Sequence, residues 1–337
     1  MSEADVSTPQ SVTDRPLVSI LLIAYNQEGF VAEAVRAALN QTYQPLEIII
    51  SDDASSDGTF AAIEGAVRAY SGPHRVIVRR NGANLGIGAH LSLLAQLAGG
   101  ELLVVAAGDD ISLPNRCELV VKCWIEHGRR PDLIASALTD MDDSGITHGP
   151  ITPTDLGTYR SFEDWAARQP WVIGASHVWT RRLFQQFGPI MQGAMAEDQI
   201  MTLRAIVAGG AISLSDPLVN YRRGGSSHKR LFRSVTEKVA QMRRSNQHGL
   251  IELSQLQRDA DRAGIADKMR SVLAPKFARE QFTLAMFESD SIRRRLVIML
   301  RSHGVKWGYR LRIFLYTTFP LFYAPLFQLK WILRHNR

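Results

Sequence analysis

Short apolar runs alternate with segments of helical character over the first 110 residues of this 337-residue chain. The runs at 17–23, 46–50, 75–78 and 101–105 are rich in β-formers and end at polar or turn residues. Such runs are typical of buried strands. We interpret the intervening segments 30–40, 57–70 and 88–97 as helices. This alternation predicts an α/β domain with a mostly parallel central sheet and right-handed crossovers.

The pattern becomes less regular after residue 110. A helix is expected to follow Ala196, because Ile200, Leu203, Ile206 and Val207 recur on one of its sides. Residues 222–228 are rich in glycine and serine and predict a loop. Residues 234–290 contain many charges and few helix breakers, which predicts a long helical stretch.

Charge divides the chain into two unlike parts. Residues 229–337 contain 22 Lys and Arg against 8 Asp and Glu, a net charge of +14, whereas residues 1–228 carry −8. A basic rear part favours an anionic surface, either lipid headgroups or nucleic acid. The content of 45% hydrophobic and 21% charged residues is that of a globular protein and excludes a disordered chain.

Two cysteines and the N-terminal residues indicate the cellular compartment of the protein. Cys117 and Cys123 lie six positions apart on a predicted helix and therefore on different faces, which argues against a disulfide between them. Neither has partners at zinc spacing, so we expect free thiols in a reducing cytoplasm. No basic start with an apolar core precedes the first strand, so no secretory signal is predicted.

A charge-free segment at 313–329 contains four Phe, two Tyr and two Pro between basic flanks. Its length is at the lower limit for a membrane span, and Pro320 and Pro325 interrupt it. We expect short helices that lie in a membrane interface, with basic side chains on the headgroups. A hydrophobic hairpin folded back on the protein or in a dimer, and a true span, are the alternatives.

Acidic pairs follow two of the predicted strands. Asp52 and Asp53 end the second strand, and Asp109 and Asp110 follow the fourth. Ligands of open α/β sheets bind at the carboxyl ends of the strands. Four carboxylates in one crevice repel each other unless a cation or a donor-rich ligand lies among them. Turn and helix-capping roles are the structural alternatives for these residues.

The order of short motifs resembles glycosyltransferase family 2 over about residues 16–228. The matching segments are Val18-Ser19-Ile20, Ala24-Tyr25-Asn26, Gln41-Thr42-Tyr43, Glu47-Ile48-Ile49-Ile50, Asp52-Asp53-Ala54-Ser55-Ser56-Asp57-Gly58-Thr59, Asn84-Leu85-Gly86, Gly108-Asp109-Asp110, Pro114 with Arg116, and Glu197-Asp198. No single motif is decisive, but their order and spacing together are specific. The resemblance implies a GT-A-type nucleotide-sugar-binding domain with a mostly parallel sheet.

The resemblance also implies roles for individual residues. Asp53 would accept hydrogen bonds from the nucleotide base, Asp110 would ligate Mn²⁺ or Mg²⁺ on the diphosphate with Asp109 beside it, and Asp198 would be the general base. The site is then expected in three groups: nucleotide-sugar binding at Ile23, Ala24, Tyr25, Asn26, Asp53, Asn84 and Asp109; catalytic carboxylates at Asp198 and Glu197; and metal ligation at Asp110, Asp109 and His228. Oxygen ligands suit these hard cations, and a carboxylate base activates an acceptor hydroxyl.

The chain departs from the family pattern at two places. Ala107 stands where many members carry a further Asp, so one carboxylate near the metal is missing. His228 is a candidate to compensate for it. The Gln-x-x-Arg-Trp motif of processive members is absent, because Gln241-Met242-Arg243-Arg244 lacks the Trp, which indicates transfer of a single sugar.

We therefore expect an inverting glycosyltransferase that uses a UDP- or dTDP-type sugar donor and a glycan or lipid-linked acceptor, in cell-surface polysaccharide synthesis. A degenerate sugar-nucleotide-binding scaffold, prompted by Ala107, and a nucleotidyltransferase are the rival functions. Arg222 and Arg223 either reach the diphosphate or are solvated, and Arg116 is expected to be structural. Trp165, Trp171 and Trp179 pack in the core or, as a second option, offer a platform for an acceptor sugar.

The expected parts are a tail at 1–15, the catalytic domain at 16–228, a helical extension at 229–304 and a membrane-associating segment at 305–337. The expected location is the cytoplasmic face of a membrane, and a homo-oligomer is possible. No nucleic-acid partner is expected, because the basic rear part contains no recognised binding module.

Overall fold

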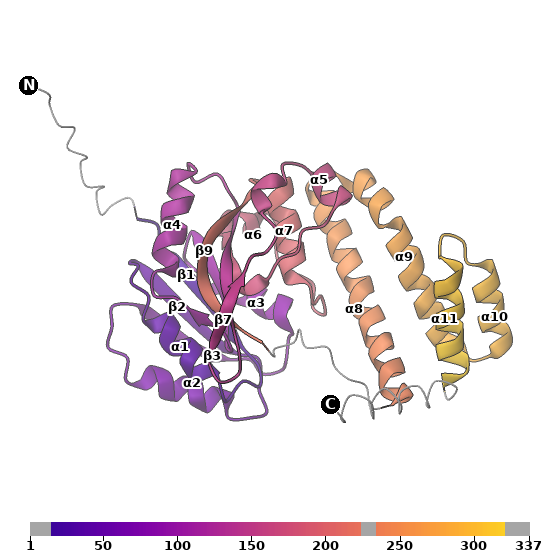
Figure 1. Ribbon diagram of the computed structural model, residues 1–337, viewed down its shortest axis with the longest axis horizontal. Helices are drawn as coiled ribbons and strands as arrows, with labels where there is room; N and C mark the ends of the chain where they lie inside the picture. The colour runs from indigo at the N-terminus through magenta and orange to yellow at the C-terminus, as the bar shows by residue number, and fades with distance from the viewer. Residues whose placement is uncertain (1–14, 224–233, 321–337) are drawn as a thin grey trace, which may run out of the picture.

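The computed structural model describes residues 15–223 and 234–320 (Figure 1). The strands are β1 (Val18–Ala24), β2 (Leu46–Asp52), β3 (Arg75–Arg80), β4 (Leu102–Ala107), β5 (Ile111–Ser112), β6 (Leu133–Met141), β7 (Thr147–Ile151), β8 (His177–Thr180) and β9 (Ala211–Arg222). The helices are α1 (Val31–Leu39), α2 (Thr59–Arg68), α3 (Ile87–Leu97), α4 (Arg116–Glu126), α5 (Phe162–Ala167), α6 (Arg181–Phe187), α7 (Glu197–Val207), α8 (Val235–Arg262), α9 (Ala266–Glu288), α10 (Ile292–Arg301) and α11 (Trp307–Thr318). Two 3₁₀ turns, η2 (Leu156–Thr158) and η3 (Gly174–Ser176), complete the order.

The strands form one sheet in the order β3-β2-β1-β4-β8-β6-β9-β5, with β7 beside β6. The first four strands in this order are parallel to one another. Strand β8 runs antiparallel between β4 and β6, whereas β6 and β9 are again parallel. The predicted α/β sheet is therefore confirmed, with antiparallel strands added in the part of the chain where the sequence pattern lost its regularity.

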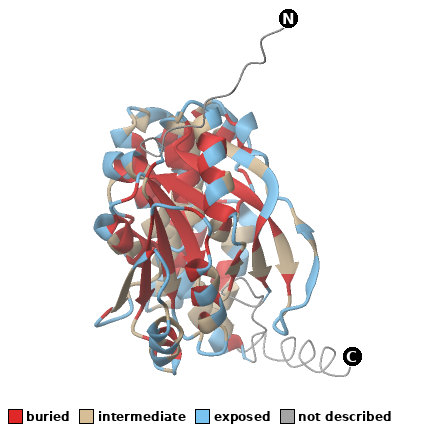
Figure 2. Cartoon of the chain, turned by 90° about the vertical axis from the view of Figure 1, so that its left-hand side faces the viewer, coloured by how far each residue is buried: buried red, intermediate tan, exposed pale blue. Residues whose placement is uncertain are grey.

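Helices cover both faces of the sheet, and each face has its own apolar core. Successive residues of a strand point to opposite faces. In β1, Ile20 and Leu22 pack with α1, α2 and α4, while Leu21 packs with α3, α6 and α7. Both faces are buried, as Figure 2 shows by the red strands at the centre of the molecule. Double burial explains why the first strands read as continuous apolar runs.

Helices α8 and α9 contribute to the apolar core that contains α3, α6 and α7. Leu253, Leu256 and Ala260 of α8 and Met269 and Leu273 of α9 belong to the core that covers the α7 side of the sheet. Helices α10 and α11 lie beyond α9, at the far end of the molecule from α1 and α2 (Figure 1). The predicted helical stretch at 234–290 is thus confirmed, apart from the short break between α8 and α9. The predicted hydrophobic segment 313–329 is described only as far as residue 320.

Candidate functional site

Main-chain hydrogen bonds hold the carboxyl ends of β1, β2 and β4 together. The N–H of Asp53 donates to the carbonyl of Ala24 over 2.9 Å, and the N–H of Gly108 donates to the carbonyl of Ile23 over 2.9 Å. The segments that follow these three strands therefore leave the sheet side by side. The predicted clustering of residues from all three strand ends is what the parallel register produces.

The turn after β1 is fixed by side chains of the segment after β2. Asn26 has a positive φ of 50°, and its N–H donates to Oγ of Ser55 over 2.9 Å. Its amide oxygen accepts from the N–H of Ser56. Tyr25 is left 49% exposed beside this turn, whereas Ala24 is buried. An exposed aromatic ring next to a fixed main chain suits the side of a nucleoside.

Asp53 is buried and holds the loop before α3. Its carboxylate accepts from Nδ2 of Asn81 over 2.7 Å and from the N–H groups of Leu85 and Gly86 at 3.0 Å each. Nδ2 of Asn84 reaches the carbonyl of Asp53 over 3.4 Å. The structural role of Asp53 is therefore to hold a loop distant in the sequence, beyond the local turn considered for it, and its contact with a base stays a prediction.

Asp52 is committed within the protein. It is fully buried, Nε of Arg80 lies 3.0 Å from Oδ2, and the hydroxyl of Ser55 donates to Oδ1. Its charge is thus paired inside the fold. The turn role considered for Asp52 is the one that the structure supports.

The turn after β4 brings two carboxylates to the same edge. A Cβ on Gly108 would lie 2.9 Å from Cβ of Ala24 and 2.6 Å from Oε1 of Gln27, so glycine allows β4 to end against the turn after β1. Burial raises the pKa of Asp109. Burial and the neighbouring charge of Asp109 raise the pKa of Asp110 to about 8. Two carboxyl groups in this state favour a nearby cation.

Arg222, at the end of β9, braces this turn from inside the protein. Its N–H donates to Oδ1 of Asp110 over 2.8 Å, and its Nε donates to the carbonyl of Asp109 over 2.9 Å. The remaining guanidinium nitrogens bind Glu33 and the carbonyls of Asp142 and Asp143. All three guanidinium nitrogens of Arg222 donate hydrogen bonds inside the protein, so Arg222 is a structural residue. It is not solvated, and its contacts differ from the diphosphate contact considered for it.

Arg116 lies between strand β5, which follows Asp109 and Asp110, and turn η3, which packs against Glu197 at the start of α7. It is buried at the start of α4, where it donates to Oγ of Ser112 over 2.9 Å and to the carbonyl of Ala175 over 2.8 Å. The structural role expected for Arg116 is confirmed by these contacts. A Cβ on Gly174, next to Ala175, would lie 2.6 Å from Oε1 of Glu197. Turn η3 thus lies between Arg116 and the start of α7.

Glu197 and Asp198 open α7 in a poorly solvated place. Burial, the charge of Asp198 and the charge of Glu252 raise the pKa of Glu197 to about 8. Burial also raises the pKa of Asp198, and the charge of Glu252 adds to this effect. A carboxyl with a raised pKa is a stronger base once it has lost its proton. The arrangement suits proton transfer at Asp198.

Helix α8 holds the loop that leads to this pair. Oε1 of Glu252 accepts from the N–H groups of Met195 and Ala196, both at 3.1 Å. Oε1 of Gln255 accepts from the N–H of Met191 over 2.7 Å. Glu252 was missed in the sequence analysis, because nothing in a charged helical stretch separates it from solvated neighbours. Gln27, which hydrogen-bonds Asp109, was missed although it adjoins a motif.

The residues present fit a divalent cation as an open, two-carboxylate site. Asp109 and Asp110 supply hard oxygen donors, and the second oxygen of Asp110 accepts no hydrogen bond from any described residue. No group of three or more His, Cys, Asp or Glu within 15–223 and 234–320 is arranged to hold a metal. His228 lies outside the described residues. Ala107 leaves the end of β4 with two carboxylates, so diphosphate oxygens and water would complete the coordination.

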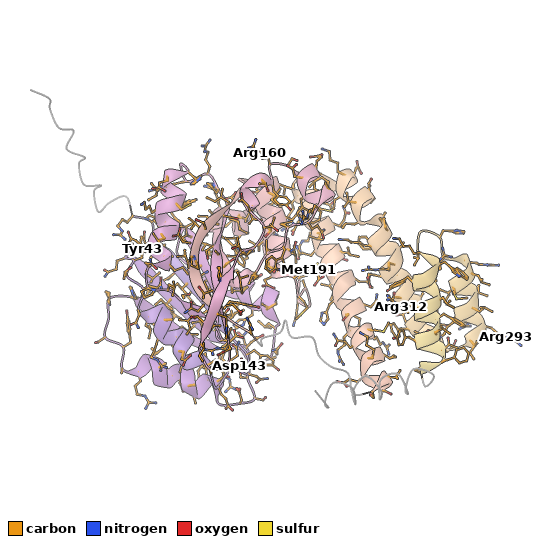
Figure 3. All side chains as sticks on the ribbon, viewed as in Figure 1. Tyr43, Asp143, Arg160, Met191, Arg293 and Arg312 are labelled. Carbon is orange, nitrogen blue, oxygen red and sulfur yellow. The ribbon has the colours of Figure 1, made fainter. Side chains whose placement is uncertain are left out.

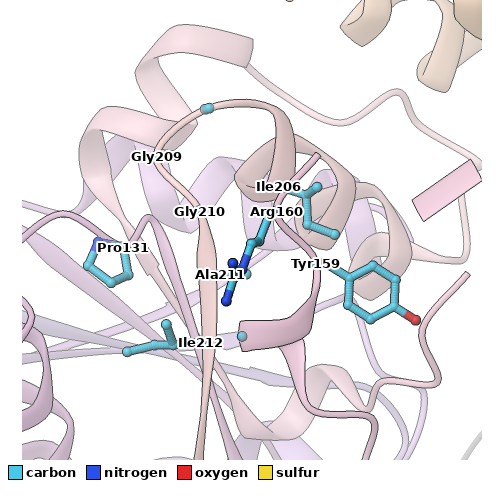
Figure 4. Close-up of a pocket in the computed structure, with 10 residues that line it drawn as sticks. Pro131, Tyr159, Arg160, Ile206, Gly209, Gly210, Ala211 and Ile212 are labelled. Carbon is cyan, nitrogen blue, oxygen red and sulfur yellow. The ribbon is translucent and has the colours of Figure 1, made fainter. Parts of the chain in front are cut away.

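Two hollows lie away from the strand ends β1, β2 and β4. One of about 330 Å³ opens where β6 and β9 begin, lined by Tyr159, Arg160 and the glycines at 209 and 210 (Figure 4). This is the opposite edge of the sheet from Asp109 and Asp110. The other, of about 220 Å³, lies between α7, α8 and α9 and is lined by Ala196, Gln199 and Glu252 among others. It adjoins the first residues of α7.

The three tryptophans separate into two groups. Trp165 and Trp179 are buried in the core that covers the α7 side of the sheet, as the core interpretation predicted. Trp171 is 56% exposed.

Cys117 and Cys123 are both buried and free, which confirms the prediction for the thiols.

Comparison with known proteins agrees with the motifs. Residues 19–148 match the family described as glycosyl transferase family 2. The chain is 38% identical over 208 residues to the uncharacterized protein Rv1520 of Mycobacterium tuberculosis, an alignment that covers 61% of this chain and 58% of Rv1520. For the first curated relatives the chain spans about half of their length, 49% in one and 45% in another.

Two solved structures share the fold at low sequence identity. TarS 1–349 of S. aureus in complex with UDP-GlcNAc has a TM-score of 0.53 and 16% identity, covering 89% of this chain and 88% of TarS 1–349. The mannosyltransferase PcManGT of Pyrobaculum calidifontis, in complex with GDP-Man and Mn²⁺, has a TM-score of 0.51 and 16% identity over 92% and 87% of the two chains. These likenesses confirm the GT-A-type fold predicted from the sequence.

Proposed function

This chain belongs to glycosyltransferase family 2 through residues 19–148, and from that premise we propose that it transfers a single sugar from a nucleotide diphosphate sugar to an acceptor hydroxyl. One observation carries the proposal. The carboxylates after β4 and those at the start of α7 lie far apart in the sequence, yet Arg116 links Ser112, just after Asp110, to turn η3, and turn η3 packs against Glu197. The proposed metal ligands Asp109 and Asp110 and the proposed base Asp198 would then lie at the same edge of the sheet.

The donor would lie over the ends of β1, β2 and β4. The exposed ring of Tyr25 and the fixed main chain from Ile23 to Asn26 support a nucleoside there. TarS and PcManGT bind UDP-GlcNAc and GDP-Man, which supports a nucleotide sugar as the class of donor. Within that class we propose a UDP- or dTDP-type donor, as the family resemblance suggests.

Asp109 and Asp110 would hold Mn²⁺ or Mg²⁺ with the donor diphosphate. A bound divalent cation supplies charge that stabilises the diphosphate as it leaves. The raised pKa of Asp110 indicates a carboxyl that ionises readily only when a cation is close. Arg222 would keep both carboxylates in place, because it holds the main chain of Asp109 and a carboxylate oxygen of Asp110. The Mn²⁺ bound by PcManGT supports this assignment.

Asp198 would take the proton from the acceptor hydroxyl. With one base and direct displacement at the anomeric carbon, transfer inverts the configuration of the sugar. Glu197, buried and with a pKa raised to about 8, would remain protonated beside it, so that the pair carries a single charge near neutral pH. Ala196 and Gln199, which flank the acidic pair in the sequence, line the hollow between α7, α8 and α9, and this supports an acceptor near the start of α7.

The proposal assigns catalysis to residues 16–228, with 229–304 as a helical extension and 305–337 as a membrane-associating segment. A glycan or lipid-linked acceptor of cell-surface polysaccharide synthesis fits an enzyme at the cytoplasmic face of a membrane. The net charge of +14 in residues 229–337 supports that location, since cytoplasmic leaflets are anionic.

The test measures nucleoside diphosphate released from UDP-, dTDP- and GDP-sugars with Mn²⁺ or Mg²⁺. Asp110→Asn keeps an oxygen that can accept the N–H of Arg222 but loses the charge, so we expect turnover to fall by about 10²–10³-fold. Asp267→Asn, on a carboxylate that is 93% exposed on α9, is the matched control and should retain full activity. Turnover that survives chelation and Asp110→Asn alike would overturn the assignment.

A scaffold that binds sugar nucleotides without turnover is the second candidate. The observation that favours it is Ala107, which leaves two carboxylates at the end of β4. It predicts calorimetric binding of a nucleotide together with no release of nucleoside diphosphate from any donor, even with a glycan acceptor present. Binding that requires Mn²⁺ and is followed by turnover would exclude it.

A further inference from the structure

The outermost pair of helices, α10 and α11, carries most of the apolar side chains that this chain leaves in solvent. Of the twelve large apolar side chains exposed within 15–223 and 234–320, seven belong to residues 292–319. They are Ile292, Leu296, Val297, Leu300, Trp307, Leu311 and Phe319. Single apolar residues are ordinary on a protein surface, but a concentration of this kind marks an interaction face.

The inward sides of both helices are already occupied. Met299 of α10 and Phe314 of α11 pack with Phe282 and Met286 of α9 in a small core of their own. Ile292, Leu296 and Leu300 recur every fourth residue, so they form one stripe along α10. Their exposed fractions are 52%, 42% and 55%. The stripe is therefore a separate surface rather than a loosely packed part of that core.

Charge on the two helices has one sign. Residues 292–319 contain seven Arg and Lys and no Asp or Glu. Arg293 and Arg301 are exposed and form no ion pair with any described residue. Arg295 differs, because it donates to the carbonyls of Ser289 and Thr317 and so fixes the hairpin. Figure 3 shows Arg293 at the outer edge of these helices, far from the sheet.

Trp307 adds a side chain suited to an interface between water and lipid. It is 52% exposed at the start of α11, and the guanidinium of Arg310 lies over its ring, 5.8 Å from the centroid. Trp and Arg are both typical of the headgroup level of a membrane, where an apolar body meets a polar or charged end.

We propose that this lipid-docking face, made of Ile292, Leu296, Leu300, Trp307 and Leu311 with Arg293 and Arg301 beside them, binds an anionic phospholipid surface. The contact would be interfacial, because the apolar stripe occupies one side of α10 and basic side chains adjoin it. In the described part of the chain no helix is long and apolar enough to cross a bilayer. The apolar side chains enter the boundary between headgroups and acyl chains, and the guanidiniums meet lipid phosphates. The face extends the membrane segment predicted at 305–337 back to α10. It needs no sugar nucleotide, so it stands apart from the proposed transfer.

The experiment is cosedimentation of the full chain with phosphatidylcholine vesicles that do or do not contain phosphatidylglycerol. We expect binding that requires phosphatidylglycerol and weakens at high salt. Arg293→Glu with Arg301→Glu should weaken it by at least about 25-fold, since each basic group near an anionic surface strengthens binding by about fivefold. Leu296→Glu with Leu300→Glu should reduce it by at least as much.

Matched variants on the sheet domain control for charge and for folding. Leu97→Glu on α3 and Arg68→Glu on α2 change an exposed apolar and an exposed basic residue elsewhere, and each should bind vesicles as the unchanged chain does. Circular dichroism of every variant confirms that it is folded. Binding that persists in Leu296→Glu with Leu300→Glu would overturn the proposal, as residues 321–337 would then suffice.

Size-exclusion chromatography with light scattering tests the other occupant. If a second copy of the chain covered the stripe, the unchanged chain would be a dimer and the Leu296→Glu, Leu300→Glu variant would be a monomer. Neither of them would then sediment with vesicles. That outcome would also overturn the proposal. Because no nucleotide sugar is present in either measurement, neither result bears on whether the chain is a glycosyltransferase.

Discussion

Arg204 of α7 and Asp259 of α8 form a buried ion pair with two contacts, Nε to Oδ2 at 2.8 Å and a terminal guanidinium nitrogen to Oδ1 at 3.0 Å. Burial lowers the pKa of Arg204 and raises the pKa of Asp259, and their pairing only partly offsets it. The pair therefore joins α8 to the helix that starts with Glu197 and Asp198, at a cost in desolvation.

Removing one member of this pair should destabilise the whole fold. Asp259→Ala leaves a buried guanidinium without its partner, and we expect a loss of about 3–5 kcal/mol in the free energy of unfolding. Arg204→Met combined with Asp259→Leu removes both charges and should cost much less than the single change. Urea unfolding measures both. Asp267→Ala, which breaks an exposed pair on α9, should change stability little.

Arg222 and Arg223 are adjacent, yet they should respond very differently to the same substitution. Arg222→Lys gives up the planar fork that holds Glu33 and the carbonyls of Asp109, Asp142 and Asp143. We expect a loss of about 1.5–3 kcal/mol in the free energy of unfolding. Binding of the nucleotide-sugar donor should also weaken, because the turn after β4 is no longer held in place. Arg223→Lys is the control, since the side chain of Arg223 is 58% exposed and, among the described residues, pairs with Asp140. Equal effects of the two changes would contradict the bracing role.

Glu252 should raise the pH at which the base becomes active. Burial first, and then the charge of Glu252, raise the pKa of Asp198. Glu252→Gln keeps an oxygen that accepts from Met195 and Ala196 but removes the charge. The rising limb of kcat/KM against pH should then move down by up to about one pH unit.

Glu252→Ala separates this electrostatic effect from positioning. It removes the acceptor as well, so kcat should fall at every pH while the limb still moves. If Glu252→Gln leaves the pH profile unchanged, Glu252 has no electrostatic influence on Asp198.

Glu197 should cost stability as the pH rises. Its folded pKa of about 8 lies above the ordinary value of 4.5, so the folded state keeps a proton that the unfolded state has lost. Its contribution is fully present below about pH 4.5 and is lost as the pH approaches 8. Glu197→Gln should therefore gain a few kcal/mol over the unchanged chain near pH 8 and little near pH 4, because each pH unit between the unfolded and folded pKa contributes about 1.4 kcal/mol.

Urea unfolding of Glu197→Gln and of the unchanged chain at several pH values gives this difference directly. A gain of the same size at both ends of the range would mean that the substitution acts through packing and not through ionisation.

The sequence by itself determined the strands of the first half of the sheet and the acidic residues at their ends. Runs such as 46–50 are apolar throughout because both of their faces are buried, and that signal is local. Where parallel strands end is fixed by their pairing, so Asp53 and Asp110 were expected at one edge.

Only the tertiary structure decided what each of these groups contacts. Asp53 closes a loop by accepting from residues about thirty positions away, Arg222 reaches the β4 turn from the other end of the domain, and Glu252 supports the start of α7 from another helix. These contacts leave no periodic trace, because a single long-range hydrogen bond constrains one residue and not a pattern. The stripe on α10 differs, because it does have a periodic pattern. Its apolar spacing was in the sequence, but only the packing of Met299 against α9 showed which side of the helix is left in solvent.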